Sequence, residues 1–153
     1  MNHNARLAEI LLVEDNEGDI ELTKEAFEEA KFRNNLHVVE DGDMALDYLF
    51  KRNGNENAVT PDIVLLDLNL PGTDGREVLE AIKADNALKR ITVSVLTSSK
   101  ADRDVVESFE LHASCYIVKP VNATKLMDVV QHVENFWVDI VCLPSFSDET
   151  KCA

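Results

Sequence analysis

Short apolar runs alternate with longer amphipathic stretches along most of the chain. The apolar runs predict β-strands, and they lie at Glu9–Val13, Leu36–Val39, Asp62–Leu66, Ile91–Leu96 and Cys115–Val118. The third of them, DIVLL, is a continuous run, which suits a central parallel strand that is covered on both faces. The pattern therefore indicates a parallel sheet between layers of helices.

Amphipathic stretches follow these strands one by one, with the 3.6-residue period of α-helices. They lie at Gly18–Lys31, Asp43–Arg52, Gly75–Ala84, Asp102–Leu111 and Ala123 to about Trp137. In the second stretch, one apolar side is formed by Ala45, Leu46, Leu49 and Phe50.

The regular alternation of strands and helices predicts a fold of the α/β class. We expect a doubly wound, flavodoxin-like (βα)5 sheet of five parallel strands in the order 2-1-3-4-5, with helices on both faces and right-handed connections. The length of 153 residues fits one domain, which we place at residues 8–137. Residues 138–153 form an apolar extension and tail that is too short to fold alone, so no separate effector domain is expected.

Polar side chains stand where the predicted strands end. Glu14 and Asp15 follow the first strand, Asp67 the third, Thr97 the fourth and Lys119 the fifth. The carboxyl ends of parallel strands meet at one edge of the sheet, where ligands bind. Adjacent carboxylates repel one another unless a cation lies among them, and oxygen ligands of this kind suit Mg²⁺. Carboxylates, Mg²⁺, a lysine and a hydroxyl together match phosphoryl transfer to an aspartate nucleophile.

Each of these residues also has a purely structural interpretation. Asp15 lies between a strand and a helix, where an aspartate often caps the helix. Lys119 alone would be an ordinary surface lysine. Asp67 is different, because an unpaired carboxylate at the end of a buried strand is costly and calls for a partner. Asn16 and Asp19 fit the start of the first helix and need no catalytic role.

The charge of the chain narrows the choice of partners. Its 15 basic and 29 acidic residues give a formal net charge of -14, which argues against nucleic acid and favours metal cations or a basic protein surface. No apolar run reaches the roughly 18 residues of a membrane helix, and no signal peptide is expected. Cys115, Cys142 and Cys152 lack the spacing of a metal site, so we expect reduced thiols and a cytoplasmic protein.

Four segments, ILLVEDNEGD, DIVLLDLNLPGTDG, VLTSS and YIVKP, resemble the receiver domain of two-component response regulators, and the resemblance extends over about Ala8–Trp137. It implies that Asp67 is the phosphoacceptor. It also implies a site for Mg²⁺, or for another divalent cation such as Mn²⁺ or Ca²⁺, formed by Glu14, Asp15, Asp67 and the backbone carbonyl of Asn69. Such a protein is a switch with self-phosphorylation and autodephosphorylation activity, and it is not a turnover enzyme.

The same resemblance implies a conformational switch beside the phosphoacceptor. The hydroxyl of Thr97 would reach the phosphoryl group, and Tyr116 would turn inward when Thr97 moves. Lys119 would bind the phosphoryl group, and its bond to Pro120 is typically cis in the family. Since no effector domain is expected, the output would be a contact with another protein.

A narrower resemblance rests on LHASCYIVKP and ENFWVDIVCLP, which are similar to the single-domain phytochrome-partner response regulators of cyanobacteria. It implies a light-sensing histidine kinase as the partner, and a homodimer. The candidates for the dimer contact are four apolar residues, whose exposure would be unfavourable in a monomer: Phe136, Trp137, Val138 and Ile140. Alternatively, this segment folds back over the last helix or the amino end of the chain.

Two other functional classes fit the pattern less well. A phosphatase of the haloacid-dehalogenase type combines an aspartate nucleophile with a second aspartate two residues later as general acid, and here that position is Asn69. A flavodoxin-like electron carrier needs a phosphate-binding loop rich in Ser, Thr and Gly after the first strand, where this chain has EDNEGD. The phosphatase stays the alternative to the receiver.

Overall fold

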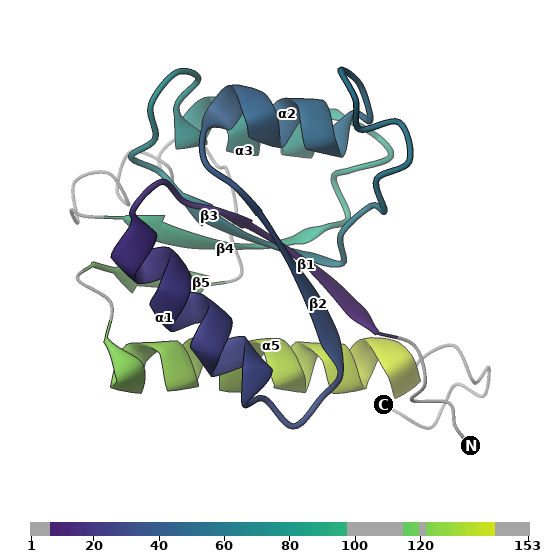
Figure 1. Cartoon of the computed structure of the whole chain (residues 1–153). Helices are drawn as coiled ribbons and strands as arrows, with labels where there is room; N and C mark the ends of the chain where they lie inside the picture. Colours follow the sequence, from purple (N-terminus) through teal and green to yellow (C-terminus); the bar gives the residue numbers. More distant parts are fainter. Residues whose placement is uncertain (1–6, 98–114, 120–121, 143–153) are drawn as a thin grey trace.

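The computed structural model describes residues 7–97, 115–119 and 122–142. The helix predicted at Asp102–Leu111 and the predicted switch residue Pro120 lie outside these ranges. The described elements (Figure 1) are, in chain order, β1 (Ala8–Val13), α1 (Glu17–Glu28), β2 (Asn34–Val39), α2 (Gly42–Leu49), β3 (Ile63–Asp67), α3 (Gly75–Ala84), β4 (Thr92–Thr97), β5 (Cys115–Val118) and α5 (Ala123–Cys142). None of the helices among the described residues is long and apolar enough to cross a membrane.

The strands form one five-stranded sheet in the order β2-β1-β3-β4-β5, and each neighbouring pair is parallel. This confirms the predicted α/β fold and its flavodoxin-like strand order. β3 lies at the centre, and every one of its residues is buried, as the continuous apolar run predicts. Figure 1 shows α1 and α5 on one face of the sheet and α2 and α3 on the other.

The core is divided by the sheet into two layers, because successive side chains of a strand point to opposite faces. On one face, Leu12 of β1 lies in a cluster with Phe27 of α1 and Val129 of α5. On the other face, Leu11 of β1 lies in a cluster with Val78 of α3. Both layers therefore hold β1 and β3 firmly, so their carboxyl ends are rigid supports for polar side chains.

Side chains cap the helices that follow β1 and β3. The Asn16 carboxamide oxygen accepts a hydrogen bond of 2.9 Å from the backbone N–H of Asp19, so Asn16 is the cap of α1 and the cap interpretation of Asp15 is wrong. Asp74 caps α3 in a reciprocal capping box with Glu77. The side chain of Asp15 therefore does not cap the helix, and it lies with the other acids at the edge of the sheet.

Gly75 begins α3 directly against the end of β3. A Cβ atom added to Gly75 would lie 2.4 Å from the backbone oxygen of Asp67 and 2.5 Å from the Cα of Leu68. The Gly75 N–H donates a hydrogen bond of 3.2 Å to the Leu68 carbonyl. Because this residue has no side chain, α3 packs on the backbone that carries Asp67 and fixes its position.

The end of α2 differs from the prediction. The helix ends at Leu49 instead of Arg52. Phe50 follows as the C-cap and its side chain is 37% exposed, so it lies just outside the helix that was predicted to include it. The next residue, Lys51, has a φ of 58°, and this left-handed conformation stops the helix.

The last helix is longer than predicted, because α5 continues to Cys142. Trp137 is only 5% exposed and lies in the same core cluster as Phe27 and Val133. Trp137 is therefore covered by its own chain, as in the alternative that this segment folds back on the domain, and its part in a dimer contact stays a prediction. The other dimer candidates lie on the same helix, with side chains outside the described part of the structure: Phe136, Val138 and Ile140.

Candidate functional site

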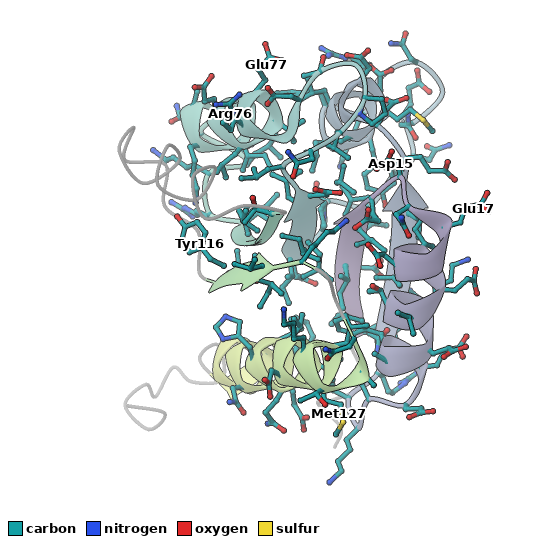
Figure 2. All side chains as sticks on the ribbon, turned by 90° about the vertical axis from the view of Figure 1, so that its left-hand side faces the viewer. Asp15, Glu17, Arg76, Glu77, Tyr116 and Met127 are labelled. Atoms are coloured by element: carbon teal, nitrogen blue, oxygen red, sulfur yellow. The ribbon has the colours of Figure 1, made fainter. Side chains whose placement is uncertain are left out.

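The carboxyl ends of β1, β3 and β5 bring the predicted polar residues to one edge of the sheet. Glu14 and Asp15 follow β1, Asp67 ends β3, and Lys119 follows β5. Three of them, Asp15, Asp67 and Lys119, line an open pocket of about 560 Å³, together with Asn16, Glu17, Gly18 and Asn69. Figure 2 shows Asp15 at the end of β1, next to the start of α1 and its Glu17. The convergence predicted from the sequence is therefore present.

The ammonium group of Lys119 is the centre of this cluster. Its Nζ atom lies 2.8 Å from Oε2 of Glu14 and 2.9 Å from Oδ2 of Asp67. A third carboxylate, that of Asp19, lies 3.0 Å away. A lysine ammonium has three N–H donors, so each donor can meet one carboxylate.

The carboxylates of the cluster differ in burial. Glu14 is 1% exposed and Asp67 is 2% exposed, whereas Asp15 is exposed to solvent. Oxygen atoms of Glu14, Asp15 and Asp67 lie within 4.8 Å of one another. Buried acids need a compensating charge, and Lys119 supplies one positive charge against several carboxylates.

This donor set fits a hard divalent cation. Mg²⁺ prefers oxygen ligands and keeps several waters, and here one exposed and two buried carboxylates offer oxygens beside an open, polar pocket. The excess of negative charge over the single lysine would be offset by such an ion. The residues present therefore fit the metal that the sequence predicts.

The shared site shifts the pKa values of its members. Burial, the largest cause, raises the pKa of the Glu14 carboxyl to about 7, the hydrogen bond from Lys119 opposes this rise, and the charge of Asp67 adds to it. For Lys119, burial works against the charged form, but hydrogen bonds to Glu14, Asp67 and Asp19 outweigh it and raise the pKa of the ammonium. Lys119 is thus a fixed positive charge at neutral pH.

Backbone hydrogen bonds hold the charged residues in place. The N–H of Asn69 donates to Oδ1 of Asp67 at 2.8 Å, and the N–H of Asn16 donates to Oε2 of Glu14 at 3.2 Å. The N–H of Lys119 donates to the carbonyl of Thr97 at 2.7 Å. The main chain therefore orients the two buried acids, and β4 holds the backbone from which the lysine side chain starts.

The two predicted switch residues lie on the neighbouring strands β4 and β5. Thr97 is fully buried at the end of β4, and it is opposite Val118 in the register of the sheet. Tyr116, two residues before Val118, is half-buried and packs against the core on the side of α2 and α3. Residues opposite each other or two apart in a strand share a face, so Thr97 and Tyr116 project from the same face.

The sequence did not reveal the contact of Asp19 with Lys119. Asp19 lies in the first turn of α1, and its position fits a helix start without any functional role. One signal was available: the first turn of a helix that follows a strand lies beside the carboxyl edge of a parallel sheet. An acid in that turn is therefore placed to reach a lysine that ends another strand.

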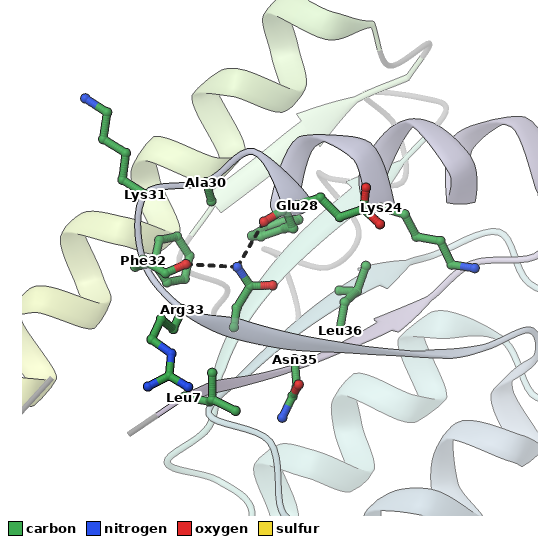
Figure 3. Close-up of a pocket in the computed structure, with 11 residues that line it drawn as sticks. Leu7, Lys24, Glu28, Ala30, Lys31, Phe32, Arg33, Asn35 and Leu36 are labelled. Atoms are coloured by element: carbon green, nitrogen blue, oxygen red, sulfur yellow. Dashed lines mark hydrogen bonds between the residues drawn. The ribbon is translucent and has the colours of Figure 1, made fainter. Parts of the chain in front are cut away.

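A hollow of similar size, about 580 Å³, lies at the opposite end of α1 (Figure 3). It is lined by Lys24, Arg33 and Leu36, among others. The Asn34 side-chain amide donates to the backbone carbonyls of Phe27 and Phe32, which closes the loop before β2. The polar residues predicted from the strand ends line the pocket beside Asp67 and do not line this hollow. The two volumes are similar, so the candidate site is identified by the chemistry of its lining residues.

Comparison with known proteins gives consistent matches. Residues 10–131 match the family model of the response regulator receiver domain. Response regulator Rcp1 of Synechocystis sp. is 44% identical over 136 residues, which cover 89% of this chain and 92% of Rcp1.

Two solved structures extend these matches. The phosphorylated cyanobacterial phytochrome response regulator RcpA has a TM-score of 0.78 and 44% identity, covering 91% of this chain and 99% of RcpA. The Mn²⁺-bound form of Rcp1 has a TM-score of 0.76 and 44% identity, with coverage of 90% and 99%. The similarity therefore extends over the sheet and its helices and is not confined to short motifs.

Proposed function

Because the chain belongs to the response regulator receiver domain family of two-component signalling, we propose that Asp67 accepts a phosphoryl group from a histidine kinase and thereby switches a protein-interaction surface. The observation that carries this proposal is the position of the Asp67 carboxylate. It is buried at the end of the central strand, it lines an open pocket, and it lies 2.9 Å from the Lys119 ammonium.

The proposed step transfers the phosphoryl group from a phosphohistidine of the kinase. A carboxylate oxygen of Asp67 forms a bond to phosphorus while the bond from phosphorus to the imidazole nitrogen breaks. The electron pair of that bond stays on the imidazole, which leaves. The transferring oxygens carry negative charge, and the Lys119 ammonium is near enough to Asp67 to neutralise part of it.

A divalent cation would be held by Glu14, Asp15 and Asp67 together with the backbone carbonyl of Asn69. When bound, it supplies positive charge that neutralises the phosphoryl oxygens. The oxygen donors and their spacing support this assignment, and Mg²⁺ is the proposed ion, with Mn²⁺ or Ca²⁺ as substitutes. The solved Mn²⁺ form of Rcp1 supports a divalent site in a similar protein.

The proposed switch connects the phosphoryl group to the β5 edge of the sheet. Its oxygens would attract the Thr97 hydroxyl, and Tyr116 would follow toward the space that Thr97 leaves. The position of both residues on one face of adjacent strands supports such coupling. Lys119 joins the two parts, because its ammonium contacts Asp67 and its backbone N–H contacts Thr97. In this proposal the chain phosphorylates and dephosphorylates itself but does not turn over a substrate, and it works in the cytoplasm.

The proposed partner is a histidine kinase of the phytochrome type. Support comes from RcpA, whose structure is that of a cyanobacterial phytochrome response regulator. A homodimer is also proposed from the resemblance, and Trp137, a candidate for its contact, is 5% exposed in the single chain. Light scattering of the purified chain at tens of micromolar tests the dimer, and a clean monomer would contradict it.

Intact-mass measurement after incubation with Mg²⁺ and acetyl phosphate tests the central proposal. We expect a single phosphate adduct, which is absent in Asp67→Asn and in the presence of a chelator. Asp128→Asn, at an exposed position of α5, is the matched control and should keep the adduct. Sustained hydrolysis of a generic phosphoester without an adduct would favour the aspartate-dependent phosphatase instead.

A further inference from the structure

The Lys119 ammonium contacts three carboxylates, and these come from three different parts of the chain. Glu14 follows β1, Asp67 ends β3, and Asp19 lies in the first turn of α1. We propose that Asp19 is a positioning residue that holds Lys119 in the unphosphorylated protein and releases it when a phosphoryl group arrives on Asp67. This inference rests on the proposed phosphoacceptor function.

The geometry supports this role because a phosphoryl oxygen needs one of the three N–H donors of Lys119. With each donor within 3.0 Å of a carboxylate, the new oxygen must replace an existing partner. Glu14 is a poor candidate for release, since its side chain is 1% exposed. A buried carboxylate that loses its cation is left unpaired at high cost. Asp67 needs no release, because after one of its oxygens is joined to phosphorus the other, a carbonyl oxygen, can still accept a hydrogen bond from Lys119.

Asp19 is the partner that can be released at low cost. Its side chain is 20% exposed, so water can replace the lysine as its hydrogen-bond donor. The Lys119 side chain is 16% exposed as well, so solvent weakens the attraction between the two charges. The contact between Asp19 and Lys119 is therefore strong enough to orient the ammonium and weak enough to exchange.

The side chain of Asp19 is separate from the structural role of this residue. Its backbone N–H donates to the Asn16 cap, and its backbone carbonyl accepts a hydrogen bond of 2.7 Å from the Thr23 hydroxyl. The carboxylate contacts Lys119. A change of the side chain therefore leaves the hydrogen bonds that start α1 in place, and it tests the contact with Lys119 rather than the stability of the helix.

Two consequences for phosphorylation follow from this contact. The Asp19 carboxylate competes with the phosphoryl oxygens for Lys119, and its negative charge repels an anionic donor. Removal of the carboxylate should therefore strengthen binding of the donor and prolong the life of the phosphorylated form. Both effects should decrease at high ionic strength, because salt screens charges that reach solvent.

The test compares Asp19→Asn with the wild type, using acetyl phosphate at saturating Mg²⁺ and intact mass as the readout. We expect a half-saturating donor concentration about two- to fivefold lower, which corresponds to the strength of such an ion pair, and an unchanged maximal rate. Dephosphorylation after donor removal should slow by a similar factor. Asp19→Glu should restore wild-type behaviour in part, which a helix defect would not.

Glu21→Gln is the matched control. It also removes one acid of α1 that pairs with a lysine, because Glu21 lies 3.8 Å from Lys24 on the exposed side of the helix. We expect wild-type kinetics from this variant. If Asp19→Asn behaves like Glu21→Gln, or phosphorylates more slowly than the wild type, the inference is wrong even though the phosphoacceptor function stands. Loss of the adduct in the wild type would instead contradict the proposed function itself.

Discussion

The Nζ atom of Lys119 lies 2.9 Å from Oδ2 of Asp67, although 52 positions separate the two residues in the chain. Their contact joins the end of the central strand β3 to the end of the edge strand β5. A buried carboxylate and a fixed positive charge at this distance are suited to the transfer of an anionic group. The first prediction concerns this pair.

Lys119→Met should slow adduct formation from acetyl phosphate by about a hundredfold or more, the usual cost of removing one stabilising donor from the transition state. The variant should also be less stable than the wild type without divalent cations, because Glu14 and Asp67 lose their shared cation. Mg²⁺ should restore part of this stability. Intact-mass kinetics measures the rate of adduct formation, and thermal unfolding with and without chelator measures stability. Equal rates of adduct formation for variant and wild type would contradict the role of Lys119 in the transfer.

Divalent cations should stabilise the folded chain. Ions that bind the folded form alone raise its stability in proportion to the logarithm of their concentration, so the midpoint of thermal unfolding should rise with Mg²⁺ and fall again with chelator. Asp15→Asn should weaken this response, because Asp15 contributes an oxygen to the cluster. Asp128→Asn, which removes an exposed acid of α5, should leave the response intact. An unchanged midpoint in the wild type over the millimolar range would argue against a metal site.

Glu14 should give a defined pH dependence of stability in the absence of metal. Burial raises its folded pKa to about 7 from an ordinary value of 4.5, so between these values the folded chain binds more protons at this group than the unfolded chain does. The contribution of Glu14 to the free energy of unfolding therefore falls as pH rises from about 4.5 to 7. Relative to the wild type, Glu14→Gln should gain stability over this range, by up to roughly 3 kcal/mol. Urea unfolding with chelator at several pH values measures the difference, and curves that run parallel would exclude this effect.

Gly75→Ala should lower the stability of the folded chain. The new methyl group would meet the Asp67 carbonyl oxygen at 2.4 Å, and overpacking of this kind typically costs about 1–3 kcal/mol. Gly18→Ala is the matched control, because its methyl group would approach only the side-chain oxygen of Asn16, at 3.3 Å. Denaturant unfolding should separate the two variants, and equal losses of stability would contradict close packing at Gly75.

Trp137→Ala should destabilise the domain itself, by about 3–5 kcal/mol, because the indole is buried in the core between the sheet and α1 and α5. Met127→Ala removes a side chain of the same helix that is 69% exposed and points outward in Figure 2, so it should cost less than about 0.5 kcal/mol. Denaturant unfolding compares the two variants. Similar costs would contradict the buried position of Trp137.

Much of the fold follows from local patterns. The continuous apolar run in β3 and the apolar stripes of the helices indicate which side chains are buried. The strand order and the capped starts of the helices also agree with the general rules for parallel α/β sheets and helix caps. The three strand-end acids and the lysine could be predicted as a group, since parallel strands end at one edge. The exposure of Phe50 and the burial of Trp137 could not be predicted in this way, because an apolar residue near the predicted end of a helix can face either solvent or core, and tertiary packing decides between them.

The contact of Asp19 escaped prediction for a different reason. The residues around Asp19 in the sequence fit the start of α1 and need no further explanation. The contact of its carboxylate is with Lys119, which is far along the chain. The direction of a side chain in the first helical turn depends on how the helix crosses the sheet, and sequence periodicity does not report this angle. Only the assembled sheet edge shows that a third acid reaches the ammonium.

The contact between Glu14 and Lys119 spans 105 positions of the chain, and this spacing matters during biosynthesis. Both acids that need the lysine, Glu14 and Asp67, leave the ribosome well before it does, because chains are made from the amino end. Until Lys119 has been made, neither acid has this lysine as its counter-charge. The contact therefore forms only after the chain has been made as far as the end of β5, so the charges at this edge of the sheet are balanced late in synthesis.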